Sequence, residues 1–171
     1  MNRNLLIIGA GIYGLVAKEI AESMNCFEKI DFVDDLAEKT PDGISVKGKT
    51  SDIKVLNKDY GCIVVAIGNP EFRLKILKSI EEETDYNIVN LISPYSYVSA
   101  SAKLGKGCIV EPMAVVHTGC IMGDGCLISA GAVVNHAAVL CEGVHIDCNA
   151  TVTGYKTVPR GTKVESGAVF K

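Results

Sequence analysis

The sequence predicts an α/β plus β architecture: a small Rossmann-like parallel sheet, followed by a parallel β-helix of hexapeptide repeats. Two observations carry this prediction. Apolar strands alternate with helices over residues 4–92, and from residue 98 an aliphatic residue returns at every sixth position. Alternating strands and helices indicate a parallel sheet, whereas a short fixed period indicates a solenoid. We therefore expect two domains, residues 1–93 and residues 94–171.

Composition supports a globular protein with a sizeable core. The chain has 171 residues, of which 48% are hydrophobic, and a net charge of −3. This charge gives no reason to expect a nucleic acid or a membrane surface as partner, and no segment has the length and polarity of a transmembrane helix or signal peptide. Seven cysteines without paired spacing favour reduced thiols and a cytoplasmic location.

The first domain is expected to contain four strands and two helices. Strands are predicted at residues 4–8, 29–33, 62–67 and 86–92, and helices from about residue 12 to 24 and from 71 to 82. Each strand is a short apolar run, and the first helix places Leu15, Val16 and Ile20 on one face. Residues 36–60 are polar and loop-like, with one short strand expected around residues 53–56.

A glycine-rich turn follows the first strand and begins the first helix. Gly9, Gly11 and Gly14 satisfy the dinucleotide fingerprint, with Asp34 about 20 residues further on. Glycines let the backbone approach a diphosphate, and a helix N-terminus offers free N–H groups. We interpret the turn as a nucleotide-diphosphate site; an NAD site and a purely structural turn are the alternatives. Tyr13, inside the turn, either packs on a ligand or covers the start of the helix.

The second domain is defined by its sixfold repeat. The repeated aliphatic positions are Val98, Leu104, Val110, Val116, Met122, Ile128, Val134, Leu140, Ile146, Val152, Val158 and Val164. The residue two positions earlier is usually small, as at Ala102, Cys108, Ala114, Cys120, Cys126, Ala132, Ala138 and Ala150. Each hexapeptide is expected to form one strand and one turn, so that three close a coil of about 18 residues and about four coils stack. The aliphatic and small residues share a close-packed interior.

The three histidines are expected to point away from that interior. His117 and His136 lie at predicted corners, and His145 directly precedes the interior residue Ile146. Most such histidines are simply solvated, but Gly154, one coil beyond His136, would offer a backbone N–H beside the imidazole. A general base next to an oxyanion donor is the minimum for acyl transfer from a thioester. Zinc binding by these histidines is the alternative, but their spacing does not suit it, and we expect no metal.

Several motifs together carry a family resemblance. They are Gly-Ala-Gly-Ile-Tyr-Gly at 9–14, Phe-Val-Asp-Asp at 32–35, Ala-Ile-Gly-Asn at 66–69, Arg73, Val-Asn-Leu-Ile at 89–92 and Asn-His at 135–136. With these motifs the chain resembles the two-domain sugar O- and N-acetyltransferases, a group that includes the nucleotide amino-sugar N-acetyltransferases of bacillosamine and perosamine synthesis and the sialic acid O-acetyltransferases. The resemblance implies a left-handed β-helix, a first domain that binds a UDP- or GDP-sugar, and a homotrimer that holds acetyl-CoA as cosubstrate between neighbours.

The same resemblance implies roles for individual residues. His136 matches the family's catalytic base, His145 a second histidine near the acetyl group, and Gly154 a glycine whose amide contacts the thioester carbonyl. The nucleotide-sugar site is implied at Gly9, Gly11, Tyr13, Gly14, Asp34, Asp35 and Asn69. The family often has histidine at the position of Tyr13.

The chain departs from the family pattern at two places. Ala137 stands where the family usually has an acidic residue that orients the catalytic histidine, and Glu111 and Asp124 are candidates to replace it. The family also continues for another coil and a Gly-x-Pro-Ala-Lys-like end, whereas this sequence stops at Lys171, so the resemblance implies that part of the coenzyme groove is missing.

These observations predict an enzyme that moves acetyl from acetyl-CoA to the amino group of a nucleotide-linked amino-dideoxy sugar, with His136 as general base. No acyl-enzyme is expected, because a general base suffices for direct attack on the thioester. The alternatives are O-acetylation of sialic acid or another sugar and a non-catalytic sugar-nucleotide-binding scaffold, which Ala137 favours.

Overall fold

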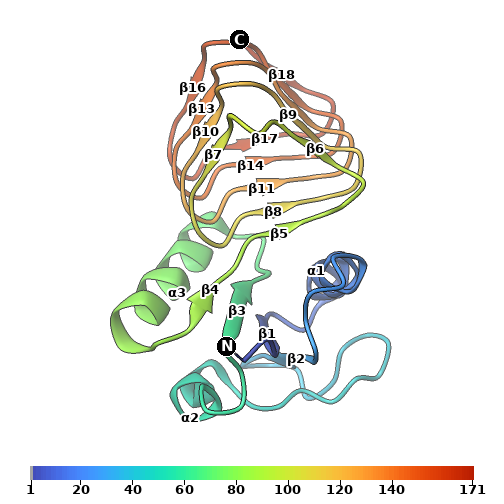
Figure 1. Ribbon diagram of the computed structural model, residues 1–171, viewed down its shortest axis with the longest axis vertical. Helices are drawn as coiled ribbons and strands as arrows, with labels where there is room; N and C mark the ends of the chain where they lie inside the picture. The colour runs from blue at the N-terminus through green and yellow to red at the C-terminus, as the bar shows by residue number, and fades with distance from the viewer. Residues whose placement is uncertain (1) are drawn as a thin grey trace. The chain divides into compact units, whose positions relative to one another are not determined.

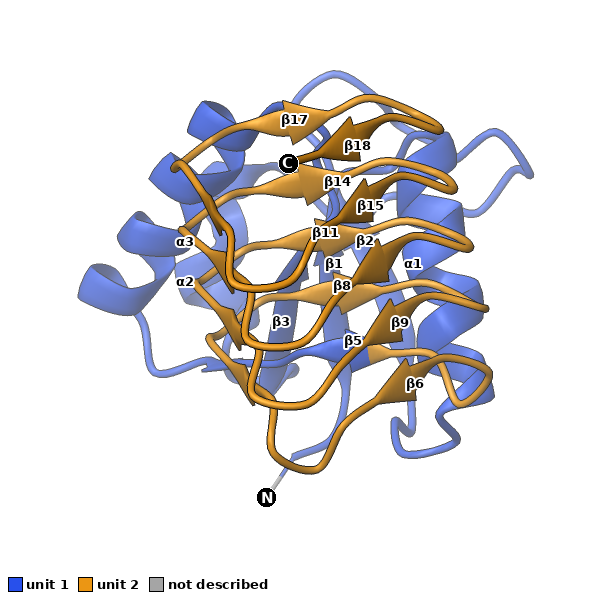
Figure 2. Cartoon of the chain, turned by 90° about the horizontal axis from the view of Figure 1, so that it is seen from above, with its two compact units in different colours: residues 1–91 blue, residues 92–171 orange. Residues whose placement is uncertain are grey.

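The computed structural model describes residues 2–171. The chain divides into two compact units, residues 1–91 and residues 92–171 (Figure 2). The first unit is a small α/β domain and the second is a left-handed parallel β-helix, which confirms the predicted fold class. Within residues 2–171, none of the helices has the length and apolar character needed to cross a bilayer.

The first unit is built on a parallel sheet with strand order β2-β1-β3-β4. The strands are β1 (Leu5–Ile8), β2 (Ile30–Val33), β3 (Cys62–Val65) and β4 (Asn87–Ile88). One face carries α1 (Ile12–Ser23), and the other carries α2 (Ile53–Leu56) and α3 (Pro70–Glu83) (Figure 1). Because both faces are covered, β1 is apolar along its whole length and every one of its side chains is buried.

The start of α3 is set by local sequence. Asn69 accepts a hydrogen bond from the Phe72 N–H at 2.9 Å, and Pro70 occupies the first helical position. Both choices are favourable there, because the side chain satisfies an N–H that the helix leaves without a partner and proline has no N–H to satisfy. The buried face of α3 consists of Arg73, Leu74, Leu77 and Ile80.

The strand expected around residues 53–56 is wrong, because this segment forms α2 after the 3₁₀ turn η1 (Thr50–Asp52). The β-branched residues Ile53 and Val55 suggested a strand. In the structure Ile53 is buried, Leu56 packs against the same core, and Val55 is exposed. Buried positions three residues apart fit a helix, whereas a strand would bury alternate residues.

The strand expected at residues 86–92 is two separate strands. Asn87–Ile88 forms β4 beside β3, whereas β5 (Leu91–Ile92) is the first strand of the β-helix and lies beside β8. The β-helix therefore begins one hexapeptide before the first residue of the predicted repeat, since Ile92 lies six residues before Val98 and packs against the same core.

The β-helix consists of two-residue strands in three parallel sheets. The first sheet contains β7 (Lys103–Leu104), β10 (Ile121–Met122), β13 (Val139–Leu140) and β16 (Thr157–Val158). The second contains β5, β8 (Ile109–Val110), β11 (Leu127–Ile128), β14 (His145–Ile146) and β17 (Lys163–Val164). The third contains β6 (Tyr97–Val98), β9 (Val115–Val116), β12 (Val133–Val134), β15 (Thr151–Val152) and β18 (Val169–Phe170).

Successive coils stack with a fixed register of 18 residues. Val116 pairs with Val134, which pairs with Val152, so that like positions of each coil form a column. Figure 2 shows these coils lying one above another in the second unit. The aliphatic and small residues of the repeat fill the interior, and Cys108, Cys120 and Cys126 are fully buried there.

From residue 107 onward, each corner turn contains one residue in the left-handed region, again with period six. Glycine occupies this place at positions 107, 119, 125, 131, 143, 161 and 167, and other residues occupy it at Met113, Ala137, Asn149 and Tyr155. Glycine is favoured because a positive φ costs it little, whereas a Cβ makes this conformation costly. The corners therefore have a sequence requirement of their own, independent of the core.

Candidate functional site

His136 lies in the corner turn between β12 and β13, with its side chain exposed. Its Nδ1 is 2.7 Å from Oδ1 of Asn135, and the same oxygen accepts the His136 backbone N–H at 2.8 Å. The ring of Tyr155 stands edge-on to the imidazole, with centroids 5.2 Å apart and planes at 84°. The imidazole is therefore held by a polar contact on one side and an aromatic contact on another.

Gly154 lies one coil beyond His136, and the structure brings the two together as the repeat predicts. A Cβ built on Gly154 would meet Nε2 of His136 at 2.8 Å, closer than real Cβ contacts allow. Among residues 2–171 no group accepts the N–H of Gly154, whereas the next N–H, that of Tyr155, donates to the His136 carbonyl at 3.1 Å. Nε2 of His136 and the backbone of Gly154 thus lie side by side, and acyl transfer needs a base next to a backbone donor.

His145 occupies a different part of the β-helix, in β14 of the second sheet. Its Nε2 is 3.0 Å from Oγ of Ser129 and 3.9 Å from Oδ1 of Asp147, and its side chain is only 15% exposed. Within one chain the structure therefore does not place it beside the His136 imidazole. The predicted contact of His145 with the acetyl donor stays a prediction.

Asp147 is strongly held in its charged form. Burial raises the pKa of its carboxyl, but the backbone N–H of Cys148 and the side chains of Lys163 and Ser166 outweigh this effect and lower the pKa to about 2. The Lys163 Nζ lies 3.0 Å from Oδ2 of Asp147. The His145 side chain consequently faces a permanent negative charge at any pH near neutrality.

Neither acidic residue considered as a replacement for the family's orienting acid contacts His136. Oε2 of Glu111 accepts the Ala130 N–H at 3.0 Å, and Oδ1 of Asp124 accepts the Lys106 N–H at 2.7 Å. Ala137, in the usual acidic position, has φ 55° and forms part of the corner turn. The residue that does contact the ring nitrogen is Asn135, which sequence reasoning noted only as part of the Asn-His motif.

In the first unit, the structural need for glycine differs among the three glycines of the turn. A Cβ on Gly9 would meet the Ala66 carbonyl oxygen at 2.7 Å, and one on Gly14 would meet the Gly9 carbonyl oxygen at 2.0 Å. Both are therefore required by backbone packing. Gly11 is the N-cap of α1, is exposed, and has nothing within 4 Å of its missing side chain. Of the three, only Gly11 has open space beside it.

Asp34 ties the glycine turn to the segment after β2. Its Oδ2 accepts the Ala10 N–H at 2.8 Å, and its Oδ1 accepts the N–H groups of Leu36 and Ala37 at 2.9 and 3.0 Å. Burial raises the pKa of the Asp34 carboxyl, but the three backbone donors lower it by more, so that the pKa lies below its ordinary value. Asp34 thus has a structural role, and its predicted contact with a nucleotide stays a prediction.

Asp35 and Asn69 also have partners within the protein. Oδ1 of Asp35 accepts both the N–H and the hydroxyl of Thr50 at 2.8 Å. Asn69 caps α3, and the fully buried Arg73 donates from Nη1 to the carbonyls of Ile67 and Gly68 at 2.6 and 2.9 Å. The turn after β3 is therefore fixed by a buried guanidinium. Tyr13 is partly buried in the first turn of α1.

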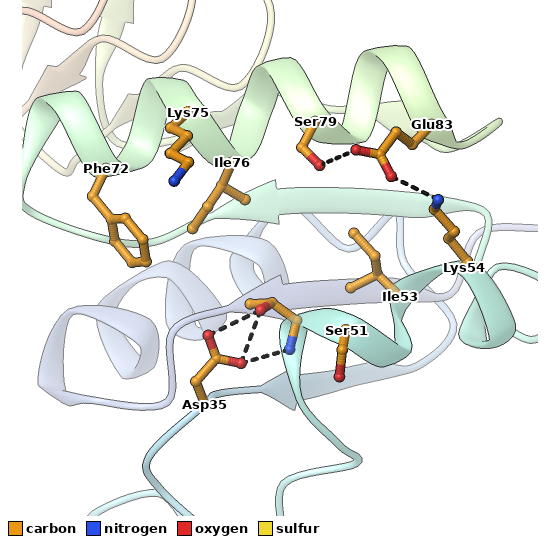
Figure 3. A pocket seen from close by; sticks show the side chains of 10 residues that line it. Asp35, Ser51, Ile53, Lys54, Phe72, Lys75, Ile76, Ser79 and Glu83 are labelled. Carbon is orange, nitrogen blue, oxygen red and sulfur yellow. Dashed lines mark hydrogen bonds and ion pairs between the residues drawn. The ribbon is translucent and has the colours of Figure 1, made fainter.

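Asp35 lines two hollows among the described residues of the first unit. One, of about 460 Å³, lies between α3 and the η1–α2 segment, with Phe72, Lys75 and Ile76 facing Asp35, Ser51 and Ile53 (Figure 3). The other, of about 310 Å³, is lined by residues 34–38, Val46, Gly48 and Lys49. Gly9, Gly11, Tyr13, Gly14 and Asn69 are not among the lining residues of either hollow.

Comparisons with known proteins agree with this architecture. A family model described as the PglD N-terminal domain matches residues 4–80. The comparison with curated protein sequences gave no match. The acetyltransferase domain of PglB from Neisseria gonorrhoeae FA1090, solved in complex with acetyl coenzyme A, is similar over 99% of this chain and 82% of its own, with 32% identity and a TM-score of 0.93.

A second solved structure shares the fold at lower identity. This is a histidine-to-asparagine mutant of perosamine N-acetyltransferase from Caulobacter crescentus, in complex with CoA and GDP-perosamine. It is 23% identical, covers 97% of this chain and 90% of its own, and has a TM-score of 0.64. With the identity and coverage shared with the PglB domain, the chain belongs to the hexapeptide-repeat sugar acetyltransferases.

Proposed function

We propose that this protein transfers acetyl from acetyl-CoA to the amino group of a nucleotide-linked amino-dideoxy sugar, with His136 as general base. The observation that carries the proposal is the imidazole of His136 held over the backbone of Gly154. The acetyl donor is supported by the PglB domain, which was solved with acetyl coenzyme A, and the amino-sugar acceptor by the perosamine N-acetyltransferase, which was solved with GDP-perosamine.

The reaction follows from the two groups at the site. As the sugar amine attacks the thioester carbonyl and the C–N bond forms, Nε2 of His136 accepts the amine proton. The Gly154 N–H donates to the carbonyl oxygen as it gains negative charge. The C–S bond then breaks, and the imidazolium returns the proton to the departing CoA thiolate. No acyl-enzyme is formed.

The first unit, residues 1–91, is proposed to bind the nucleotide part of the acceptor, as residues 1–93 were predicted to do. The N-terminus of α1 follows the glycine turn, and its first turn has no acidic residue, which suits a diphosphate. Gly9, Gly11, Tyr13, Gly14, Asp34, Asp35 and Asn69 remain the proposed contacts. Two of these residues line hollows of the first unit, Asp35 at both hollows described above and Asp34 at the smaller one, which supports a ligand there.

We also propose a homotrimer in which acetyl-CoA lies between neighbouring β-helices, with His145 and Gly154 among its contacts. His136 is exposed on a single chain, whereas thioester chemistry benefits from the exclusion of water. The second unit also exposes large apolar side chains, including Tyr97, Ile121 and Tyr155. Light scattering should give a mass three times the 18.2 kDa of the chain. A monomer at assay concentration would contradict this part of the proposal.

The cytoplasm is the proposed location. The cysteines at positions 26, 62, 108, 120, 126, 141 and 148 are free thiols, and those of the β-helix interior serve as small apolar residues. Thiols persist in a reducing compartment.

Thiol release from acetyl-CoA tests the proposed reaction. UDP- and GDP-linked 4-amino-4,6-dideoxy sugars serve as acceptors, and His136→Ala is compared with His117→Ala. His117 is a suitable control because it is also an exposed corner histidine, and its ring lies edge-on to Tyr97 at 6.4 Å. His136→Ala should lower kcat by about 10²- to 10⁴-fold, and His117→Ala should leave it unchanged.

Two other outcomes identify the alternatives. Equal slow thiol release by the wild type and His136→Ala, with normal binding of the sugar nucleotides, would favour the non-catalytic scaffold. Activity on sialic acid or another hydroxyl acceptor, with none on the amino sugars, would favour O-acetylation.

A further inference from the structure

We propose that Asn135 is the positioning residue for His136, and that its amide performs the task that an acidic residue following the histidine performs elsewhere in the family. The inference rests on the proposed role of His136 as general base. It concerns how this chain supplies that base without an acid at Ala137.

The hydrogen bonds of Asn135 identify which atom of its amide faces the ring. One side-chain atom lies 2.8 Å from the backbone N of His136 and 2.7 Å from its Nδ1. A backbone N–H can only donate, so this atom must be the oxygen, Oδ1. Because an amide oxygen can only accept, Nδ1 must carry a hydrogen.

That assignment leaves the opposite nitrogen as the base. In a neutral imidazole with a hydrogen on Nδ1, Nε2 carries the lone pair. Nε2 is the ring atom nearest to the position that a Gly154 side chain would take, at 2.8 Å. The tautomer that Asn135 selects therefore places the proton acceptor beside the backbone of Gly154.

The backbone of Asn135 is itself held from both neighbouring coils. Its N–H donates to the Val152 carbonyl at 3.0 Å, and its own carbonyl accepts from Sγ of Cys120 at 3.1 Å and from the Ala138 N–H at 3.2 Å. The Asn135 amide is joined to this fixed backbone through a single methylene group, so it has little freedom to move. The Asn135 amide is consequently a rigid guide for the ring.

An amide differs from a carboxylate in one respect that can be measured. Both accept the Nδ1–H, but only a carboxylate adds a negative charge that stabilises the imidazolium. The one ionisable side chain described in ring contact with His136 is Tyr155, which carries no negative charge near neutral pH, so an aspartate at position 135 would introduce a new charge beside the imidazole. Asn135→Asp should therefore retain activity and move the acid limb of the pH profile of kcat/KM to higher pH.

The decisive comparison is between Asn135→Asp and Asn135→Leu, which has similar volume and no acceptor. Asn135→Leu should lower kcat by about 10- to 100-fold, a part of what a positioned general base contributes. KM for acetyl-CoA and for the sugar nucleotide should change little. Ser99→Ala, which removes a polar group at the same corner position two coils earlier, should leave the rate unchanged.

The nitrogen chemical shifts of ¹⁵N-labelled histidine provide a readout that does not depend on activity. In the wild type, Nδ1 of His136 should be protonated and Nε2 unprotonated, and Asn135→Leu should shift this ring toward the Nε2–H tautomer. A wild type with Nε2 protonated would overturn the inference, as would an Asn135→Leu enzyme that is as fast as the wild type. A wild type with the expected tautomer but without acetyl transfer would instead overturn the proposed function and leave the positioning of the ring standing.

Discussion

At the scale of single residues, the absence of a side chain at Gly154 is as important as the imidazole above it. Gly154 is not in the left-handed region, so its backbone would tolerate alanine. The new Cβ would nevertheless lie 2.8 Å from Nε2 of His136, and the ring cannot retreat freely because Asn135 and Tyr155 hold it. Gly154→Ala should thus lower kcat/KM by at least about tenfold with little change in melting temperature. A Gly154→Ala enzyme with full activity would show that the ring is not held as described.

Asp147 should contribute to stability against acid. Its pKa in the folded protein is about 2, below the value of about 3.9 for an unfolded chain. Because the folded pKa lies below the unfolded one, it gives a stabilisation of at most about 2.6 kcal/mol, which is present above about pH 4 and is lost as the pH falls toward 2. The free energy of unfolding, measured with denaturant, should therefore fall more steeply between pH 4 and pH 2 for the wild type than for Asp147→Asn. Parallel pH dependences for the two proteins would refute this assignment.

The sequence identified His136 and Gly154 because a register of 18 residues follows from the repeat alone. Asn135 was missed because its contact with the adjacent ring depends on side-chain rotamers in a corner turn, which residue spacing does not specify. Similarly, Asp34 was assigned to a ligand by its position after β2, whereas its three backbone contacts depend on the course of residues 36–37 and the glycine turn.

At the scale of elements, the corner turns set a requirement that the core does not. Gly119 has φ +71°, and a Cβ there would meet nothing closer than 4.0 Å. Gly119→Ala should therefore introduce backbone strain without a steric clash and lower the free energy of unfolding by about 1 kcal/mol. The reverse change, Met113→Gly at an exposed left-handed corner, should not destabilise the protein. Chemical denaturation of both variants measures the two effects, and an unchanged Gly119→Ala would contradict the explanation.

The core repeat could be predicted because each hexapeptide buries an aliphatic residue and, in most coils, a small one. The left-handed corners share the same period but were missed, since Met113, Ala137, Asn149 and Tyr155 interrupt the run of glycines. The strand predicted at residues 53–56 was wrong because β-branched residues favour strands only weakly. Packing of this segment against the core of the first unit stabilises a helix instead.

At the scale of the whole molecule, the two units are proposed to perform separable tasks. If the first unit binds the nucleotide, His136→Ala should bind the sugar nucleotide with nearly the affinity of the wild type while losing acetyl transfer. Asp35→Ala should show the opposite pattern, with weaker binding and with kcat largely retained at saturating acceptor. Isothermal titration together with steady-state kinetics measures both. Weaker binding by His136→Ala alone would show that the tasks are not divided in this way.

Mass spectrometry of the acceptor after incubation with acetyl-CoA tests the central claim most directly. The wild type should convert a UDP- or GDP-linked 4-amino-4,6-dideoxy sugar into a product heavier by one acetyl group that resists alkaline hydroxylamine, as an amide does and an ester does not. His136→Ala should yield little of it in the same time. An acetyl group that hydroxylamine removes, or equal product from the wild type and His136→Ala, would contradict amine acetylation by a histidine base.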